Sequence, residues 1–503
     1  MQDILINIEA GERRVAILHS KKLEWYFVER IASKRIVGDI YKGKVSSVLD
    51  GMGAAFVDCG LERSGFLYVS DIIAPAADDE DADLLFPANN EKSDKKYNSN
   101  TKISSILKKG QDILLQIVKE GIGTKGARLT TQISLPGRYL VLMPTSSRIG
   151  VSRRIRDDQE RRRIKGILKE LRLPKDMGIV ARTAAAGCDK REFLRDIKYL
   201  MDTYTQIKKS AAKNKAPALV FKELDLSSKI VRDFLAEETD KVVIDDKQEF
   251  KRLRGFVSRI APKFKNKILF HKEHVPLFEK YGVEKEIDKL FERKIFLKCG
   301  GHITLEQTEG MVAIDVNSGR FTGKKNLEDT IFKVNSEAAE EVARQLRLRD
   351  VGGIIIIDFI DMESKAHRRE VFSILQNALK KDKAKAHIVS LSELDIVEMT
   401  RQRVRRSLES VSYHSCPYCA GKGMVKSATT MSIIVMRQLK SFLKLHYTKR
   451  GSVEMQVHPN VAQRLVNEDV SSLDFLRRKF RRHISVVSND NLHIEDIKIE
   501  FAK

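Results

Sequence analysis

Two apolar runs that each end in an aspartate decide the fold of the central region: Met311-Val312-Ala313-Ile314-Asp315 and Ile354-Ile355-Ile356-Ile357-Asp358. Short, continuous apolar runs of this kind are typical of buried parallel strands. Between them, apolar side chains recur at helical spacing, at Leu327, Ile331, Val334, Ala338, Val342 and Leu346. Gly352 and Gly353 then interrupt the helical pattern. The segment therefore predicts a strand, a crossover helix and a second, parallel strand.

The chemistry of this segment lies in its two aspartates. Because neighbouring parallel strands lie about 4.8 Å apart, Asp315 and Asp358 should emerge side by side at the carboxyl edge of the sheet, where open α/β sheets place their sites. The two carboxylates would repel each other unless a cation lay between them, and Asn317 faces the same way as Asp315. These oxygen donors suit Mg²⁺ or Mn²⁺ better than zinc. We therefore expect a metal site, the alternative being that each aspartate only caps a turn, and we expect Asp361 and Glu363 to be bystanders.

The charge balance points to the kind of partner. The 503-residue chain carries 92 Lys and Arg residues against 69 Asp and Glu residues, a net charge of +23. The basic residues cluster at 152–156, 161–163 and 477–482. This excess favours a polyanionic partner, most simply nucleic acid or the ribosome, over an anionic membrane surface.

Length and composition limit the class of protein. A chain this long should contain three or four compact units. No apolar run reaches the roughly 18 residues that span a bilayer, and the acidic N-terminus is unlike a signal peptide. Five cysteines are too sparse for a disulfide framework. We expect a cytoplasmic protein with reduced thiols and no membrane anchor.

The pattern along the chain predicts a multidomain protein built from α/β and α+β units. Residues 1–36 alternate like strands that need a partner, and residues 226–290 are a candidate to pair with them. From 37 to 130, short alternating runs separated by glycines indicate a small five-stranded barrel. An acidic insertion at 76–100 interrupts the barrel, and we expect it to be a mobile loop without a catalytic role. Further α/β units are expected at 131–225, 291–412 and 428–503.

Aromatic and basic residues fall on the predicted barrel. Phe56 and Phe66, flanked by Lys42 and Lys44, could stack nucleic-acid bases on a charged surface. A phenylalanine in a strand is more often part of the core. The glycines around both phenylalanines leave the two interpretations evenly matched.

The run Cys416-Pro417-Tyr418-Cys419, followed by Gly421 and Gly423, indicates a metal-binding knuckle. Structural zinc needs four ligands, and no second pair of closely spaced cysteines exists in the sequence. Cys299 and His302 could complete the site within one chain. A redox role fits this cysteine pair less well than metal binding, because we predict no thioredoxin-like frame of strand and helix around it.

Nine short runs occur in the order seen in one group of bacterial enzymes: GDIYKGKV, AAFVDCG, GFL, TKGARLTTQISLPGRYLVLMP, VARTA, AIDVNSG, GGIIIIDFIDM, EMTRQR and CPYCAGKG. Through them, nearly the whole chain resembles the endoribonucleases of the ribonuclease E/G family. The combination of AIDVNSG, IDFIDM and CPYCAGKG is highly specific.

The resemblance implies a domain organisation. Its units are an RNase H-like discontinuous domain at 1–36 and 226–290, an inserted OB-fold RNA-binding barrel at 37–130, a 5′-end sensor domain at 131–225, a DNase I-like catalytic α/β domain at 291–412, a zinc-link at 413–427 and a small C-terminal α/β domain at 428–503.

The resemblance also assigns roles to residues. It implies that Asp315 and Asp358 bind catalytic Mg²⁺ with Asn317 as their companion, and that Phe56, Phe66 and Lys125 bind RNA. The pocket for the 5′ phosphate is implied at Gly137, Val141, Arg182 and Thr183, where an arginine fork and a hydroxyl suit a terminal phosphate; an ordinary surface ion pair is the alternative for Arg182. Cys416 and Cys419 are implied to hold structural Zn²⁺ shared between two chains, giving a homodimer or a higher oligomer.

The implied function is a Mg²⁺-dependent, single-strand-specific endoribonuclease that is stimulated by a 5′-monophosphate end. It would leave 5′-phosphate and 3′-hydroxyl ends, prefer A/U-rich targets, and act in rRNA processing and mRNA decay. A non-catalytic RNA- or ribosome-binding protein is the alternative, and it would not need the paired acids. A DNA phosphoesterase is a third hypothesis, which a comparison of RNA and DNA oligonucleotides would test.

Overall fold

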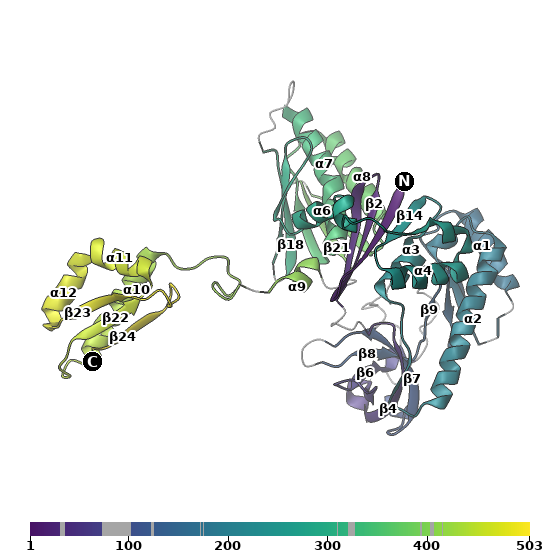
Figure 1. The fold of residues 1–503 in the computed structure, drawn as a ribbon, viewed down its shortest axis with the longest axis horizontal. Coiled ribbons are helices and arrows are strands. Elements are labelled where there is room, and N and C mark those ends of the chain that lie inside the picture. The colour runs from purple at the N-terminus through teal and green to yellow at the C-terminus, as the bar shows by residue number, and fades with distance from the viewer. Residues whose placement is uncertain are drawn as a thin grey trace. The chain divides into compact units, whose positions relative to one another are not determined.

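The computed structural model describes residues 1–30, 36–72, 102–121, 125–171, 173–174, 176–308, 310–319, 327–392, 395–402, 407–414 and 416–502 (Figure 1). The chain forms two compact units, Met1–Val411 and Ser412–Lys503. The predicted acidic insertion at 76–100 lies outside the described residues. No helix within the described ranges is long and apolar enough to cross a membrane.

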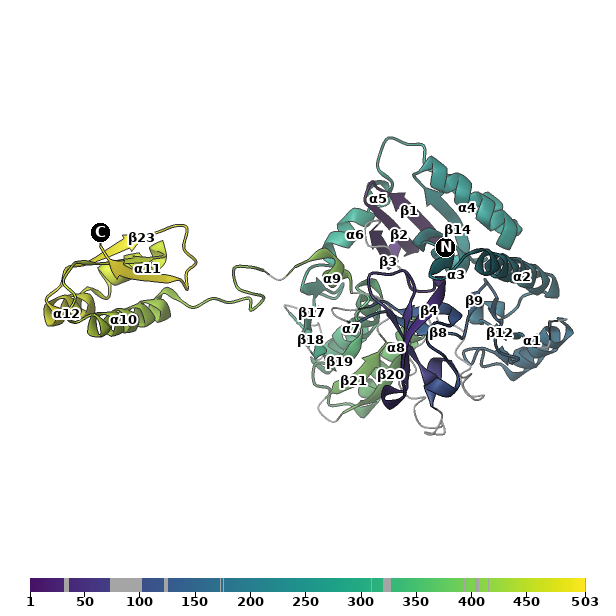
Figure 2. The same cartoon turned by 90° about the horizontal axis from the view of Figure 1, so that it is seen from below.

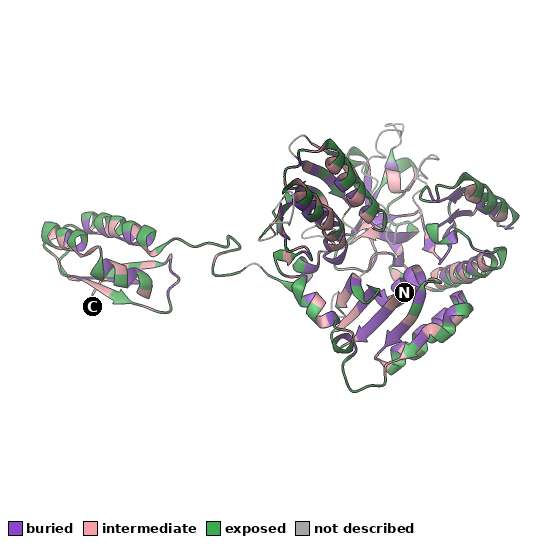
Figure 3. Ribbon diagram, turned by 90° about the horizontal axis from the view of Figure 1, so that it is seen from above, coloured by how far each residue is buried: buried purple, intermediate pink, exposed green. Residues whose placement is uncertain are grey.

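The N-terminal strands belong to a five-stranded sheet that is completed by residues far along the chain. Its order is β15 (Ile268–Phe270), β14 (Thr239–Ile244), β1 (Gln2–Ile8), β2 (Glu12–His19) and β3 (Lys22–Arg30). β1 runs parallel to β14, with Ile4 opposite Val242. The central residues of β1 and β2 are buried on both faces, since α3 (Leu226–Phe234) and α4 (Lys247–Ile260) cover one side, and α5 (Leu277–Lys280) and α6 (Val283–Lys289) the other (Figures 2 and 3).

The expected five-stranded barrel is confirmed. The strands β4 (Ile40–Leu49), β5 (Ala54–Asp58), β6 (Gly65–Tyr68), β8 (Arg128–Thr130) and β7 (Asp112–Lys119) pair in that order, and β7 closes the barrel on β4. Gly65 is required by packing, because a Cβ there would lie 2.5 Å from the Leu129 side chain. β13 (Ala218–Phe221), from the region predicted as the sensor unit, also pairs with β4.

The next unit is a four-stranded sheet with two long helices. Its order is β11 (Ile149–Val151), β12 (Gly178–Ala181), β10 (Leu140–Met143) and β9 (Leu135–Pro136). The helices are α1 (Asp158–Glu170) and α2 (Lys190–Lys213). Asp189 and Glu192 form a capping box that starts α2. The core joins apolar residues of both helices to β10 and β12.

The central region forms a six-stranded sheet whose order is β16 (Lys294–Phe296), β17 (His302–Gln307), β18 (Met311–Asn317), β19 (Gly353–Asp358), β21 (Ile396–Arg401) and β20 (Ala386–Leu391). The predicted crossover is confirmed: α7 (Leu327–Leu348) joins β18 to its parallel neighbour β19. The expectation of fully buried strands is wrong for β18, in which only alternate residues such as Val312 and Ile314 are buried. The reason is that α7 and α8 (Lys365–Lys380) pack on the same face. Among the described residues no helix packs on the other face, which carries the exposed Asp315, and we call it the open face.

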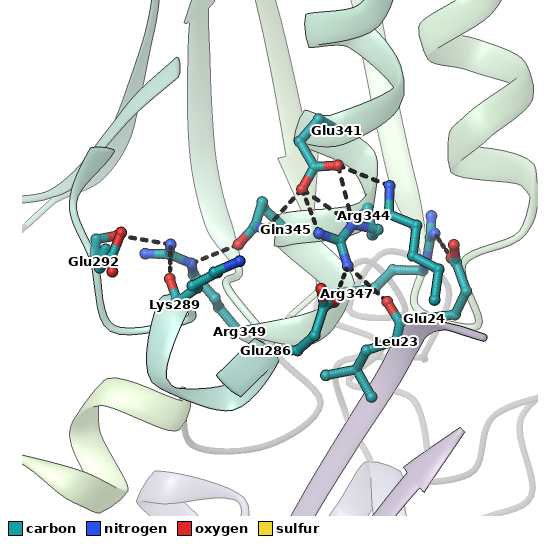
Figure 4. Close-up of polar contacts among 11 residues, drawn as sticks. Leu23, Glu24, Glu286, Lys289, Glu292, Glu341, Arg344, Gln345, Arg347 and Arg349 are labelled. Atoms are coloured by element: carbon teal, nitrogen blue, oxygen red, sulfur yellow. Dashed lines mark hydrogen bonds and ion pairs between the residues drawn. The ribbon is translucent and has the colours of Figure 1, made fainter. Parts of the chain in front are cut away.

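The last turns of α7 are tied to the N-terminal sheet by a polar network (Figure 4). Arg344 donates to the carbonyl oxygen of Leu23 at 2.7 Å and pairs with Glu341 at 2.8 Å. Arg347 pairs with Glu24 at 2.7 Å. Because these arginines are largely buried, the network fixes the helix that lies behind the predicted catalytic strands.

The second unit is a small α/β domain. Its sheet has the order β23 (Ile484–Ser488), β22 (Val453–Val457) and β24 (Ile497–Phe501), with β22 parallel to β23 and antiparallel to β24. α10 (Ala428–Leu445), α11 (Pro459–Asn467) and α12 (Val470–Phe480) contribute to one core with these strands.

Candidate functional site

Asp315 and Asp358 lie opposite each other on neighbouring parallel strands. The register runs from Met311 with Ile354 to Asp315 with Asp358. Both aspartates are exposed, because they project to the open face, away from α7 and α8. The sequence therefore predicted correctly that these two carboxylates share one edge of the sheet.

Asn317 joins this pair. β18 continues two residues beyond Asp315, and the side-chain amide of Asn317 donates to Oδ2 of Asp315 at 2.6 Å. Partial burial raises the pKa of Asp358, and the charges of Asp315 and Asp361 raise it further. Two carboxylates in mutual repulsion with an amide oxygen close by form a set of donors that would accept a divalent cation.

The loop after β19 carries the other acids considered above. Asp361 lies close enough for its charge to raise the pKa of Asp358. Glu363 instead donates its backbone N–H to Glu328 at 3.3 Å, and Glu328 also contacts His367 at 3.0 Å. Among the residues that the structure describes, no group of three or more His, Cys, Asp or Glu side chains is arranged to hold a metal ion.

The barrel aromatics lie outside its core. Phe56 and Phe66 are half-buried and neighbour each other at 5.0 Å between ring centroids, while the core consists of alternate residues such as Val57 and Leu67. Tyr68, which is 39% exposed, extends the row at 4.7 Å from Phe66. We did not single out Tyr68 from the sequence, although the period of two along a strand places it on the face of Phe66.

One basic residue contacts this aromatic row, and a second lies on the chain just before β8. The Arg128 guanidinium lies 5.3 Å from the centre of the Tyr68 ring and pairs with Asp71 at 2.9 Å. Lys125, predicted to contact RNA, is exposed in the turn that precedes β8. The barrel therefore presents a row of rings and cations of the kind that binds single-stranded nucleic acid.

The predicted 5′-phosphate pocket centres on Arg182, which follows β12. Its Nη1 atom donates to the carbonyl oxygen of Gly137 and to Oδ1 of Asp233, both at 2.6 Å. Arg182 is only 6% exposed, so this ion pair is buried and differs from the surface pair considered above. Thr183 is exposed, and Val141 is buried on β10.

Asp233 was not found from the sequence. It lies 51 positions from Arg182 on α3, and no motif marks it. It is fully buried and also accepts two hydrogen bonds from Arg232, at 3.1 and 2.9 Å. Burial alone would raise the pKa of Asp233, but the charges of Arg182 and Arg232 lower it well below its ordinary value.

Gly137 is a glycine for a packing reason. A Cβ at this position would lie within 2.6 Å of the Asp196 carboxylate. That carboxylate accepts the backbone N–H groups of Arg138, Tyr139 and Leu140 at 2.8 to 3.1 Å. The buried Asp196 therefore shapes the turn that carries the Gly137 carbonyl to Arg182.

The two knuckle cysteines lie in a turn before α10. The backbone N–H of Gly423 donates to Sγ of Cys419 at 3.3 Å and lowers the pKa of that thiol. A stabilised thiolate in a glycine-rich turn suits zinc. Sequence reasoning left open completion by Cys299 and His302, which belong to the other unit, where His302 begins β17 of the six-stranded sheet.

Comparison with protein families gives two matches. Residues 134–404 match the model of the ribonuclease E/G family, and residues 415–502 match the model described as the thioredoxin-like domain of RNase E/G. The expectation that no thioredoxin-like frame surrounds the cysteines is therefore wrong. The match covers the small domain, and the sequence did not reveal it because the two cysteines lie in a glycine-rich turn ahead of α10, the first helix of that domain.

The chain is similar over nearly its full length to characterised ribonucleases. It is 40% identical to Ribonuclease G of Salmonella typhimurium over 474 residues, and these residues are 94% of each of the two chains. It is 38% identical over 471 residues to Ribonuclease G of Haemophilus influenzae, covering 94% of this chain and 93% of that one. Ribonuclease E of Escherichia coli is 36% identical over 498 residues, which are 98% of this chain and 45% of that protein. The chain therefore belongs to the ribonuclease E/G family and is an endoribonuclease.

Proposed function

We propose that this endoribonuclease hydrolyses phosphodiester bonds of single-stranded RNA at the edge formed by Asp315 and Asp358, with Mg²⁺ bound between them. The observation that carries the proposal is the strand register, which sets the two carboxylates directly across neighbouring strands. The raised pKa of Asp358 supports it, because a divalent cation would relieve repulsion from Asp315. All the donors are carboxylate or amide oxygens, as Mg²⁺ prefers.

In this proposal each side chain has a separate role in binding the metal ion or the RNA. Asp315 and Asp358 hold the ion, and Asn317 orients Asp315 through their 2.6 Å hydrogen bond. When bound, Mg²⁺ supplies positive charge at the scissile phosphate and lowers the pKa of a water molecule. Phe56 and Phe66 stack on bases of the single strand. The products carry 5′-phosphate and 3′-hydroxyl ends.

Substituting either aspartate tests the site. Asp315→Asn or Asp358→Asn should lower the cleavage rate by several orders of magnitude at saturating Mg²⁺, while RNA affinity persists because the barrel is unchanged. Glu306→Gln is the matched control, since Glu306 is an exposed carboxylate on the neighbouring strand of the same sheet, paired with Ala313. Near wild-type turnover by either aspartate variant would place the catalytic centre elsewhere.

We also infer that the enzyme senses the 5′ end of its substrate. Arg182 and Thr183, with Gly137 and Val141, form the pocket that a terminal phosphate would enter. Support comes from the hydrogen bond and ion pair that fix one side of the Arg182 guanidinium. A preference for 5′-monophosphorylated RNA fits roles in rRNA processing and mRNA decay in the cytoplasm.

A zinc-linked homodimer is the proposed assembly. Cys416 and Cys419 supply two thiolates, half of a tetrahedral site, and a second chain related by a two-fold axis would supply the other two. The hydrogen bond from Gly423 to Cys419 supports a thiolate there.

A further inference from the structure

We propose that Phe296 and His302 form a platform on which a base of the RNA substrate stacks beside the scissile phosphate. The inference rests on the proposed catalytic site and adds a contact that determines how RNA is positioned there. Phe296 is 71% exposed at the end of β16, an unusual place for a large aromatic side chain.

The strand register aligns this platform with the proposed metal ligands. Phe296 lies opposite His302, and His302 lies opposite Asn317, so the three residues form one row across β16, β17 and β18. The adjacent row on the same face contains Lys294, Thr304, Asp315 and Asp358. With strands about 4.8 Å apart, Phe296 lies roughly 10 Å across the sheet from Asn317.

The side-chain contacts make this row suitable for nucleic acid. The Phe296 and His302 rings have centroids 6.2 Å apart and are inclined at 50°. The Lys294 ammonium group lies 5.3 Å from the centre of the Phe296 ring. An exposed ring beside a lysine is the combination that binds a base and its phosphate in single-strand binding proteins. The occupant is therefore a base of the RNA strand, which is the substrate class of this family.

The kinetic effect can be specified. A stacked base is bound in the ground state and in the transition state alike, so the contact lowers KM and leaves kcat unchanged. One base stack is worth about 1–3 kcal/mol, which corresponds to a change of roughly 5- to 150-fold in KM. Phe296→Ala should raise KM by a factor in that range, and Phe296→Trp should restore it.

The decisive experiment moves a single abasic nucleotide along a single-stranded RNA with one cleavage site. With the wild-type chain, one position next to the cut should raise KM. With Phe296→Ala, an abasic nucleotide at that position should no longer raise KM. Phe475→Ala is the matched control, because Phe475 is 57% exposed with the Lys479 ammonium group 5.4 Å from its ring, on the other unit.

Each outcome decides the inference. An unchanged KM and an unchanged abasic profile in Phe296→Ala would overturn it, while loss of cleavage by Asp358→Asn in parallel would leave the proposed function standing. Activity that persists in Asp358→Asn would overturn the proposed catalytic site itself. A fall in the molar mass of Phe296→Ala by light scattering, with kcat reduced, would show that Phe296 contacts a second copy of the chain instead of RNA.

Discussion

Asp233 offers the sharpest test of how the surroundings of Arg182, the proposed sensor pocket, are held together. The Asp233 carboxylate accepts three hydrogen bonds of 2.6 to 3.1 Å from Arg182 and Arg232. Replacing Asp233 with asparagine removes the negative charge that compensates both arginines. Removing one partner of a buried ion pair leaves uncompensated charge and costs about 3–5 kcal/mol. We therefore expect Asp233→Asn to lower the free energy of unfolding of this region by about that amount at pH 7.

The assay can use the single tryptophan of the chain. Trp25 packs edge-on against Phe234, the neighbour of Asp233, with ring centroids 5.3 Å apart. Its fluorescence during urea unfolding therefore reports on this region. The matched control is Glu237→Gln: Glu237 pairs with Lys263 at the same 2.6 Å as Asp233 with Arg182, but is 73% exposed. An exposed ion pair contributes at most about 1 kcal/mol.

The contribution of Asp233 to the free energy of unfolding should depend on pH. The folded pKa of Asp233 is depressed, so its contribution is complete above its unfolded pKa of about 3.9 and is lost as pH falls through the folded pKa. The difference between wild type and Asp233→Asn should thus be constant above about pH 5 and shrink below about pH 4. A loss at pH 7 no larger than that of Glu237→Gln would refute the reasoning.

Three further predictions concern binding and assembly. Phe56→Ala and Phe66→Ala should each weaken RNA affinity by about 1–3 kcal/mol in a fluorescence-anisotropy titration while the protein stays folded by circular dichroism; unfolding would show that these rings are core residues. Arg182→Ala should abolish the faster cleavage of 5′-monophosphorylated over 5′-hydroxyl RNA and leave basal cleavage, and equal wild-type rates on the two RNAs would contradict the pocket. Changing Cys416 and Cys419 together to serine should shift the protein from dimer to monomer by light scattering and remove one zinc per two chains by metal analysis; one zinc per wild-type monomer would exclude the shared site.

The sequence was most informative where a local pattern determines the structure. The apolar runs before Asp315 and Asp358 with the helical repeat between them specified two parallel strands and their crossover, so the pairing of the carboxylates followed from spacing alone. The glycine-separated runs specified the barrel for the same reason. A continuous apolar run, however, does not show whether one face of the strand remains uncovered, and the open face of β18 became visible only when α7 and α8 were found on one side.

The contacts that escaped prediction join distant parts of the chain. Asp233 reaches Arg182 from a helix 51 positions away, and no local feature distinguishes it from a solvated aspartate. Phe296 and His302 meet because β16 and β17 form a hairpin whose turn holds Gly300 and Gly301, a short element without a strong apolar pattern. Such contacts depend on the folded topology, which local periodicity does not encode.

The pairing of β1 with β14 also sets the order in which the protein can fold during synthesis. β1 to β3 are synthesised before β14, the parallel neighbour of β1, which begins roughly 200 residues later; at about 5–20 residues per second this is a wait of roughly 10 to 40 s. In that interval the apolar edge around Ile4 and Ile6 has no neighbour, and an unpaired apolar edge is a template for aggregation. The barrel and the sheet that follows it are synthesised within the same interval. The opening strands of the chain thus lack their parallel neighbour until residue 244 has been synthesised.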